Sequence, residues 1–423
     1  MTTASVLVCA TEISGDARGA RLASELRRLL PGLCVYGLGG ARMRRAGVDV
    51  RIDITDRGTV GWFDHWRDLP CYLSALRFWR HEIRHRRPAA AMVIDAPGIS
   101  FPFARVARAA GVPVIYFVAP QTWLWNPARA VERLRAHADV VIPTLEAEAA
   151  IYARARLPVI YEGHPALDDL VETYGEPPSQ RSGVQSSSRR FGEPGPPSQR
   201  SSVQSSSRCF VAPGPSPPFT MALVPGSRRH AIRRLLPVML DALDIVKRRV
   251  GVGRAIVSVA APALRAEVDA CLRGRRNGVE VVEDVLSAVL SASDVVLAST
   301  GGNLLDATFA GVPAVACYRV DLLTYLAAKH LLHLDTRIPA YALPNLIAGD
   351  RVVPTLIQRD VTAPRLADAA VTLMTDERAR GAIRSGYGKV RAAMGTPGVN
   401  ARIAGSLIRL VDLGCPARPL RRP

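Results

Sequence analysis

Ser5-Val-Leu-Val-Cys-Ala-Thr-Glu-Ile-Ser-Gly-Asp16 joins a β-branched, apolar run to a polar turn, and a helical pattern over 18–30 follows it. Strand, turn and helix recur in this order along the chain. The strand candidates are 5–9, 33–36, 91–94, 114–117, 140–142 and 159–161, and then 221–224, 255–259, 279–282, 295–298 and 314–316. Such alternation predicts parallel sheets with right-handed crossovers. We therefore predict an α/β protein with two Rossmann-like domains that face an inter-domain cleft.

The sharpest change in composition lies between 175 and 218. Two near-copies of a Pro-, Ser-, Gln- and Arg-rich segment follow each other there. This composition buries too little apolar surface to offset the entropy lost on ordering. The predicted organisation is an N-terminal domain over 1–174, a disordered linker over 175–218 and a C-terminal domain over 219–400. A helix and tail over 401–423 would pack back on the first domain.

Composition limits the classes of protein to consider. No run of about 18 uncharged apolar residues occurs, so we expect no membrane-spanning helix, and no signal peptide is apparent. The seven cysteines are scattered without a C-x-x-C pair, which is typical of a reducing cytoplasm. The net charge of +18 comes almost wholly from arginine. It indicates either a generic basic surface or attraction to anionic headgroups, phosphorylated sugars or nucleic acid, although no nucleic-acid motif is present.

A turn at the start of the second part predicts phosphate binding. In Val224-Pro-Gly-Ser-Arg228 an apolar strand ends and a helix begins. Gly226 lets the backbone approach a ligand closely, and the helix N-terminus favours an anion. Ser227 can cap the helix, and Arg228 offers a planar fork to phosphate oxygens. An ordinary capped turn explains the local sequence equally well.

A second glycine-rich turn, Thr300-Gly-Gly-Asn-Leu-Leu-Asp306, follows another strand candidate. Gly301 and Gly302 suit a diphosphate at a helix N-terminus. Asp306, one helical turn further on, can reach a ribose hydroxyl. A purely structural turn is the alternative.

The first part supplies the candidate acid–base groups. Asp95 stands where a buried strand ends, directly before Ala-Pro, so its carboxylate can accept a proton from an attacking hydroxyl in the crevice. His164, in Glu-Gly-His-Pro, can bind a phosphate or act as a second base. Helix capping for Asp95 and a structural role for His164 are the alternatives. The first turn also offers polar groups for acceptor handling or helix capping, at Glu12, Ser14, Gly15 and Asp16.

Two further patterns lie in a basic region. His81-Glu-Ile-Arg-His85 matches the H-E-x-x-H pattern of zinc proteases. It has no identifiable third ligand, so we predict a solvated helix face and no metal site. Aromatic residues gather among arginines at 61–66 and 72–79. They favour an interfacial membrane patch over core packing.

The collinear order of these motifs resembles the lipid-A-disaccharide synthase family. Further matching segments are Ala119-Pro-Gln-Thr-Trp-Leu-Trp125, Cys317-Tyr-Arg319, Leu343-Pro-Asn-Leu-Ile-Ala-Gly349 and Pro354-Thr-Leu-Ile-Gln358. The resemblance implies a GT-B fold and inverting transfer from UDP-2,3-diacylglucosamine to the 6-hydroxyl of 2,3-diacylglucosamine 1-phosphate. It implies no metal or organic cofactor, peripheral contact with anionic lipid at the cytoplasmic face of the inner membrane, and no nucleic-acid partner. Whether two copies pair stays open.

The resemblance assigns roles to individual residues. Asp95 would be the catalytic base, with His164 beside it. The acceptor side would comprise Glu12, Ser14, Gly15, Asp16, Trp123 and Trp125. The donor side would comprise Gly226, Ser227, Arg228, Gly301, Gly302, Asp306, Arg319, Asn345 and Gln358. This sequence departs from the family pattern on the donor side at Ala231, Asp306 and Thr355, so another sugar nucleotide or a non-catalytic sugar-lipid binder are the alternatives. An RNA-associated role would require the Ser/Arg-rich linker.

Overall fold

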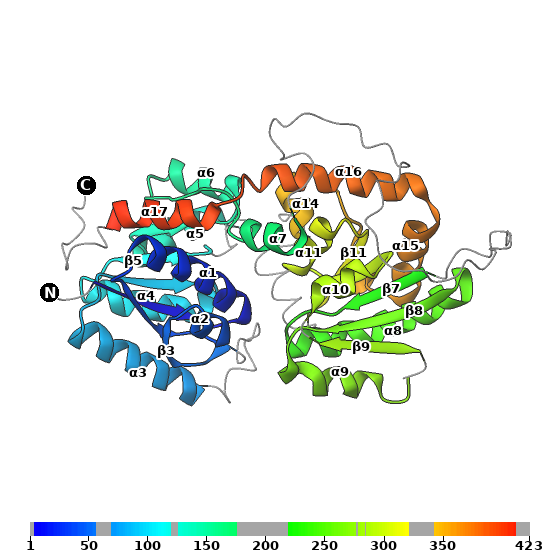
Figure 1. The fold of residues 1–423 in the computed structure, drawn as a ribbon, viewed down its shortest axis with the longest axis horizontal. Coiled ribbons are helices and arrows are strands. Elements are labelled where there is room, and N and C mark those ends of the chain that lie inside the picture. The colour runs from blue at the N-terminus through cyan, green and yellow to red at the C-terminus, as the bar shows by residue number, and fades with distance from the viewer. Residues whose placement is uncertain are drawn as a thin grey trace, which may run out of the picture.

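The computed structural model describes residues 4–55, 69–119, 126–175, 219–275, 278–283, 285–320 and 342–411. Within these ranges the chain forms two α/β halves, each built on one parallel sheet (Figure 1). The strands of the first half are β1 (Ser5–Ala10), β2 (Cys34–Leu38), β3 (Asp49–Ile52), β4 (Ala90–Ile94), β5 (Val114–Phe117) and β6 (Val140–Ile142). Those of the second half are β7 (Phe219–Val224), β8 (Val252–Val259), β9 (Val279–Glu283), β10 (Val295–Ser299), β11 (Ala314–Tyr318) and β12 (Thr355–Ile357).

Both sheets have the same topology. The strand orders are β3-β2-β1-β4-β5-β6 and β12-β11-β10-β7-β8-β9, and every pair is parallel. Counted from the first strand of each half, both orders read 3-2-1-4-5-6. This is the doubly wound arrangement, in which the direction of winding reverses between strands 1 and 4. The predicted pair of Rossmann-like domains is confirmed.

Helices cover both faces of each sheet. The first half contains α1 (Ile13–Leu29), α2 (Ala41–Arg45), α3 (Leu69–His85), α4 (Pro97–Ala109), α5 (Pro127–His137), α6 (Glu146–Arg154) and α7 (Leu167–Tyr174). The second half contains α8 (Arg229–Val250), α9 (Arg265–Leu272), α10 (Leu286–Ser291), α11 (Asn303–Ala310), α14 (Leu343–Ala348), α15 (Ala363–Thr375) and α16 (Glu377–Ala393), and α17 (Val399–Val411) follows. In the described part of the chain no helix is both long and apolar enough to cross a bilayer.

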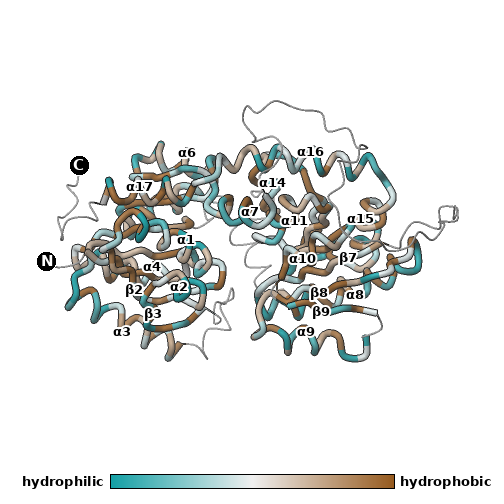
Figure 2. Tube along the Cα trace, in the orientation of Figure 1, coloured by the Kyte–Doolittle hydropathy of each residue, from teal (hydrophilic) through white to brown (hydrophobic). Residues whose placement is uncertain are grey.

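Strand β1 shows why the sheet needs helices on both faces. Successive strand side chains point to opposite faces, and all of β1 after Ser5 is buried. Val6 and Val8 belong to the core that includes the apolar face of α1, whereas Leu7 and Cys9 belong to the core beneath α3 and α4. The apolar strands therefore lie inside the layers (Figure 2). A strand buried on both faces reads as a continuous apolar run, which is the pattern that the sequence shows.

Three strand assignments differ from the sequence-based expectation, and one of them is β12, which was not predicted. Residues 159–161 form no strand, because Val159 makes only an isolated bridge to Val141. The chain then turns away at Gly163, which has a φ of +112°. In contrast, β3 was not predicted, since its alternation of polar and apolar residues is confined to four positions at the sheet edge.

Helix α17 returns to the first half. It packs against α1 and lies beside it in Figure 1, while α16 extends from the second half toward it. Ile403 and Leu407 of α17 are fully buried. The return passes a tight crossing, where a side chain on Gly163 would lie 2.8 Å from the Met394 carbonyl oxygen. The backbone N–H of His164 donates to the same carbonyl at 2.9 Å.

Asp168 fixes the start of α17. Its Oδ1 accepts hydrogen bonds from the backbone N–H groups of Gly398 (2.7 Å) and Val399 (3.1 Å), and its Oδ2 accepts from the backbone and side-chain N–H groups of Asn400, both at 2.9 Å. Burial opposes ionisation, but these hydrogen bonds outweigh it and lower the pKa of Asp168. One carboxylate of the first half thus caps a helix that follows the second half.

We expect Asp168→Asn to lower the free energy of unfolding by roughly 1.5–3 kcal/mol, because an amide would turn an N–H group toward these donors. The folded pKa is depressed, so the stabilisation is present above the unfolded pKa of about 3.9 and is lost as the pH falls through the folded value. Thermal melting of both proteins from pH 7 downward measures this difference. Asp169→Asn, whose side chain is 47% exposed, is the control. Equal melting of Asp168→Asn and the parent protein at pH 7 would contradict the assignment.

Candidate functional site

The predicted turns meet at the points where strand order reverses. Glu12 follows β1 and Asp95 follows β4, and these strands are neighbours in the first sheet. Arg228 follows β7 and Gly301 follows β10, which are neighbours in the second. The carboxyl ends of the strands at such a reversal form a crevice that binds ligands in open α/β sheets. Contacts between the halves, described below, bring the two crevices together.

Asp95 is held in a strained turn. Its φ is +54° and that of Ala96 is +41°, a left-handed conformation that is costly for residues other than glycine. The Asp95 carbonyl oxygen accepts hydrogen bonds from the hydroxyls of Ser100 (2.7 Å) and Tyr116 (3.1 Å). Its carboxylate accepts from the Ala96 N–H at 2.8 Å, and α4 begins without a side-chain cap. The turn therefore fixes Asp95 without using it as the helix cap.

The charges around Asp95 come from both halves. Burial, and next the negative charge of Glu12, raise the pKa of Asp95, while Arg18 and Arg228 act in the opposite direction. Arg18 is a site residue that the sequence analysis missed. Two carboxylates and two guanidinium groups thus influence one another at this crevice.

Arg228 joins the two halves. It donates a hydrogen bond to Glu12 Oε2 at 2.9 Å, and the two side chains are 42% and 13% exposed respectively. Burial opposes the charge on Arg228, but Glu12 outweighs it and the pKa is raised. The arginine predicted to bind phosphate is therefore paired with a carboxylate across the cleft. A diphosphate that reaches Arg228 competes with Glu12 for the same guanidinium.

The turn between β7 and α8 requires a glycine at position 226. Gly226 has a φ of +105°, and a side chain there would lie 2.6 Å from Ser299 Oγ. Only glycine fits this position without strain. The expectation that Ser227 caps α8 is wrong, because Arg228 occupies the N-cap position and no side chain caps the helix. Ser227 is instead exposed on the turn.

The glycine-rich turn between β10 and α11 leads to a second contact with the first half. Gly301 and Gly302 precede α11, and Asp306 lies in its first turn. The Tyr174 hydroxyl, at the end of α7, donates to Asp306 Oδ1 at 3.2 Å. Burial raises the pKa of Asp306 to about 6. Tyr174 therefore joins the two halves, and the sequence analysis did not identify it.

The remaining donor-side residues differ in how many hydrogen bonds their side chains make within the chain. Arg319 is exposed directly after β11. Gln358 follows β12 with a φ of +51°, and its Oε1 accepts from the Val320 N–H at 3.3 Å. Asn345 is buried, and its amide makes four hydrogen bonds within the chain, to Val352, Val353 and Thr355. The Asn345 amide is thus fully used in holding the approach to β12.

His164 is buried and neutral. Burial, and then the Arg18 charge, hold its pKa well below the usual range. Nδ1 accepts a hydrogen bond from the Ala166 N–H at 3.2 Å, so the ring proton resides on Nε2. In this state the free ring nitrogen of His164 is a donor. The arrangement favours the predicted hydrogen bond to a phosphate over the predicted role as a second base.

The acceptor-side residues of the first turn divide into two groups. Ser14 is exposed, and Gly15 packs against Ile94, next to Asp95. Asp16 is buried, and its carboxylate accepts from the backbone N–H groups of Gly40 (2.7 Å), Arg42 (2.9 Å) and Met43 (3.1 Å). Asp16 therefore caps α2. Glu12 and Ser14 remain at the crevice edge.

The remaining predictions concern the aromatic segments and the H-E-x-x-H match. Trp123, Trp125, the aromatic segment at 61–66 and all but the first residue of the predicted linker lie outside the described residues. The prediction that the aromatic residues of 72–79 favour a membrane patch over core packing is wrong. Trp79 is fully buried and packs edge-on against Phe103, and Tyr72 and Phe78 pack against the same core. In the H-E-x-x-H match, His81 is exposed, whereas Glu82 is buried and pairs with Arg86 at 3.1 Å. The glutamate and the histidine thus occupy different faces of α3. Within the described ranges no group of three candidate ligands could hold a metal ion.

Sequence comparison agrees with this geometry. The profile of a family described as lipid-A-disaccharide synthetase matches residues 6–182 and 215–396. The chain belongs to this family. The lipid-A-disaccharide synthase of Geobacter sulfurreducens is 30% identical over 408 residues, covering 96% of this chain and 97% of the relative. That of Anaeromyxobacter dehalogenans strain 2CP-C is 31% identical over 400 residues, covering 94% and 95%. The resemblance inferred from the motifs is confirmed.

Comparison with solved structures confirms the predicted GT-B fold. The spinosyn rhamnosyltransferase SpnG, solved with thymidine diphosphate, matches with a TM-score of 0.53 and 15% identity, covering 97% of this chain and all of that one. At this identity the likeness concerns the fold alone.

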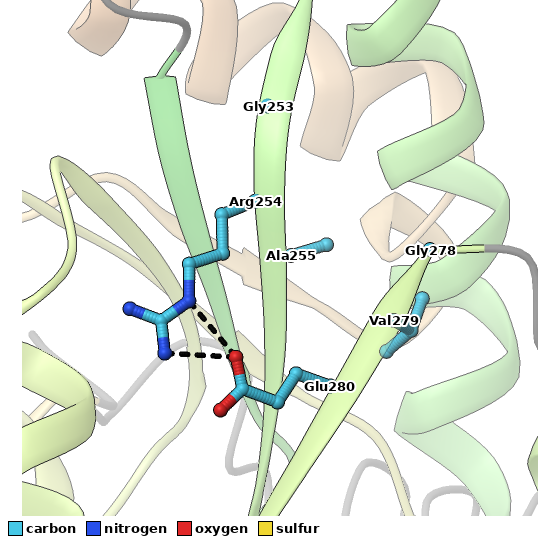
Figure 3. Close-up of a pocket in the computed structure, with 6 residues that line it drawn as sticks. All are labelled: Gly253, Arg254, Ala255, Gly278, Val279 and Glu280. Atoms are coloured by element: carbon cyan, nitrogen blue, oxygen red, sulfur yellow. Dashed lines mark hydrogen bonds and ion pairs between the residues drawn. The ribbon is translucent and has the colours of Figure 1, made fainter.

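A groove outside the crevice lies at the amino ends of β8 and β9 (Figure 3). Arg254 and Glu280 pair across it at 2.8 Å, and their side chains are 49% and 47% exposed. The two charges satisfy each other, and these strand ends lie opposite the ligand-bearing turns. The turns predicted to bind substrate therefore lie at the crevice, at the other end of the sheet from this groove.

Arg228→Ala should weaken UDP binding by roughly 1.5–3 kcal/mol, because it removes a charge-assisted hydrogen bond to phosphate. Glu12→Gln should have the opposite effect and tighten UDP binding, since it removes the competing carboxylate. Calorimetric titration with UDP measures both. Arg229→Ala is the matched control, because Arg229 pairs with Glu267. Unchanged UDP affinity in Arg228→Ala would remove this residue from the donor site.

Proposed function

We propose that this member of the lipid-A-disaccharide synthase family transfers 2,3-diacylglucosamine from its UDP derivative to the 6-hydroxyl of 2,3-diacylglucosamine 1-phosphate. The family supplies the reaction. The observation that carries the assignment of roles is the cross-domain pair of Arg228 and Glu12 beside Asp95. It brings Arg228 of one half, which we propose binds phosphate, next to a candidate base of the other.

In the proposed step, the Asp95 carboxylate accepts the proton of the acceptor 6-hydroxyl. The acceptor oxygen then bonds to the anomeric carbon of the donor, on the face opposite the leaving UDP. The bond from that carbon to the diphosphate breaks, and its electron pair leaves with UDP, so the configuration inverts. Arg228 and the N-terminus of α8 would stabilise the charge that develops on the diphosphate. The likeness to a fold solved with a nucleoside diphosphate is consistent with this donor.

In the ligand-free crevice, Arg228 and Glu12 neutralise each other's charge. When a diphosphate takes Arg228, Glu12 loses its partner and stays near Asp95. A negative neighbour disfavours ionisation of Asp95 and therefore makes its carboxylate a stronger base. Donor binding would thus prepare the base for the acceptor proton. The strained turn holds Asp95 in place during this exchange.

Asp95→Asn should reduce acceptor-dependent UDP release by about 10²–10⁴-fold, the usual contribution of a general base. UDP affinity should stay near that of the parent protein, which shows that the fold and the donor site survive. In the parent protein the rate should fall as the pH drops through the Asp95 pKa, which lies above its ordinary value. Release that retains the parental rate in Asp95→Asn would remove this residue from the mechanism.

We further propose that α3 contacts anionic membrane lipid. Leu69 and Leu73, one turn apart, are 49% and 44% exposed. Arg77, Arg80 and Arg84 continue the exposed surface of the same helix. Exposed leucines followed by arginines suit the boundary between headgroups and acyl chains. Both substrates carry acyl chains, so this contact would bring the crevice to the bilayer surface that supplies them.

Replacing both Leu69 and Leu73 with Glu should lower partition to vesicles that contain phosphatidylglycerol at least tenfold, since each buried leucine contributes roughly 1.5–3 kcal/mol. Vesicle sedimentation measures the bound fraction. Leu29→Glu, at a position that is 39% exposed on α1, is the control and should bind like the parent protein. Unaltered partition of the double variant would exclude α3 as the contact.

A further inference from the structure

Arg18 is a charged group with an unused donor beside the proposed base. It lies on α1, and its Nη1 is buried with no hydrogen-bond partner in the described part of the chain. An unsatisfied buried donor is costly, and more so when it is charged. Arginine stays protonated in proteins. The residue as a whole is only partly buried although its Nη1 is buried, so Arg18 lies at the edge of the core.

The neighbours of Arg18 define where this donor lies. Asp95, at the end of β4, and Asp169, in the first turn of α7, are the carboxylates whose charges act on Arg18. His164, between them in the sequence, is also within reach of the Arg18 charge. Neither carboxylate accepts a hydrogen bond from Arg18 Nη1, because that atom has no partner in the described part of the chain. Arg18 Nη1 thus lies near charged groups but makes no hydrogen bond to them.

Two free donors therefore occur together on the first half. One is Nη1 of Arg18, and the other is Nε2 of His164, which carries the ring proton because Nδ1 accepts from Ala166. A guanidinium and an imidazole N–H suit a phosphate monoester, whose oxygens accept several charge-assisted hydrogen bonds. Asp95 and Asp169 act on the Arg18 charge, yet neither accepts a hydrogen bond from Nη1, so this donor is left for another acceptor.

Arg18 lies apart from the residues proposed to bind the donor diphosphate. Arg228 comes from the second half and belongs with the turns after β7 and β10. Arg18 comes from α1 of the first half and lies near Asp95. In the acceptor sugar the 1-phosphate and the 6-hydroxyl lie on opposite sides of the ring. When the 6-hydroxyl is at Asp95, the 1-phosphate therefore points away from the anomeric carbon of the donor. We propose that Arg18, with His164, binds the phosphate monoester of the acceptor. This inference rests on the proposed function.

The test is equilibrium binding without donor, so that no turnover is needed. The probes are a short-chain 2,3-diacylglucosamine 1-phosphate and the same compound without its phosphate. The parent protein should bind the phosphorylated compound at least tenfold more tightly, and Arg18→Leu should bring that ratio close to one. Affinity for the unphosphorylated compound should be unchanged. Arg21→Leu, one turn further along α1 and paired with Glu172 at 2.7 Å, is the matched control and should keep the parental ratio.

Each contrary result overturns the proposal in a recognisable way. If Arg18→Leu weakens both probes equally, Arg18 acts through the fold or through Asp95. If it weakens UDP binding and leaves the acceptor ratio unchanged, the phosphate that it binds belongs to the donor. If Arg18→Leu does not fold, Arg18→Lys keeps the charge but loses the fork, and an unchanged ratio there, together with an unchanged ratio in His164→Ala, rejects the subsite. Disaccharide formation by the parent protein would still support the proposed function in all these cases.

Discussion

The site depends on one topological constraint, which both halves obey. In each sheet the order of strands reverses between the first and fourth strands, so the turns after these strands diverge and leave a crevice at their carboxyl ends. The turns that carry Glu12 and Asp95 belong to one reversal, and those that carry Arg228 and Gly301 belong to the other. Parallel strands also place all of these turns at the same edge of each sheet. The chemistry of the molecule can therefore be concentrated in four short loops while the sheets remain apolar.

Several groups in the crevice interact with a charged or polar group from a different element. Glu12 pairs with Arg228 across the cleft, Asp95 lies near both arginines, and Tyr174 binds Asp306 from the other half. In water such pairs contribute little, but partial burial strengthens them. Because the pairs join the halves, a ligand that takes one member changes the interactions that hold the crevice together. Substrate binding and the relation between the halves are thus linked through the same side chains.

Much of the fold could be predicted from sequence because buried strands leave continuous apolar runs. The turns after them were recognisable since their glycines and charged residues follow directly. Arg18 was not recognisable, because it is one arginine among many and only its unpartnered Nη1 distinguishes it. Asp168 was missed because its partners lie more than 200 residues away. Asp16 has the composition of a ligand-binding residue, yet its partners are backbone N–H groups of α2, which no local pattern reveals.

The crossing near His164 connects the site to the path of the chain. Gly163 meets Met394 and Gly395 so closely that a side chain on Gly163 would lie 2.8 Å from a carbonyl oxygen. The next residue, His164, donates its backbone N–H to the same carbonyl, and its ring is the one that we propose binds phosphate. Asp168, four residues further on, holds the start of α17. A segment of seven positions, 162–168, therefore carries the His164 ring, the close crossing and the helix cap. This segment is hydrogen-bonded both to the crossing at Met394 and to the start of α17, so His164 stands next to the point where the chain returns to the first half.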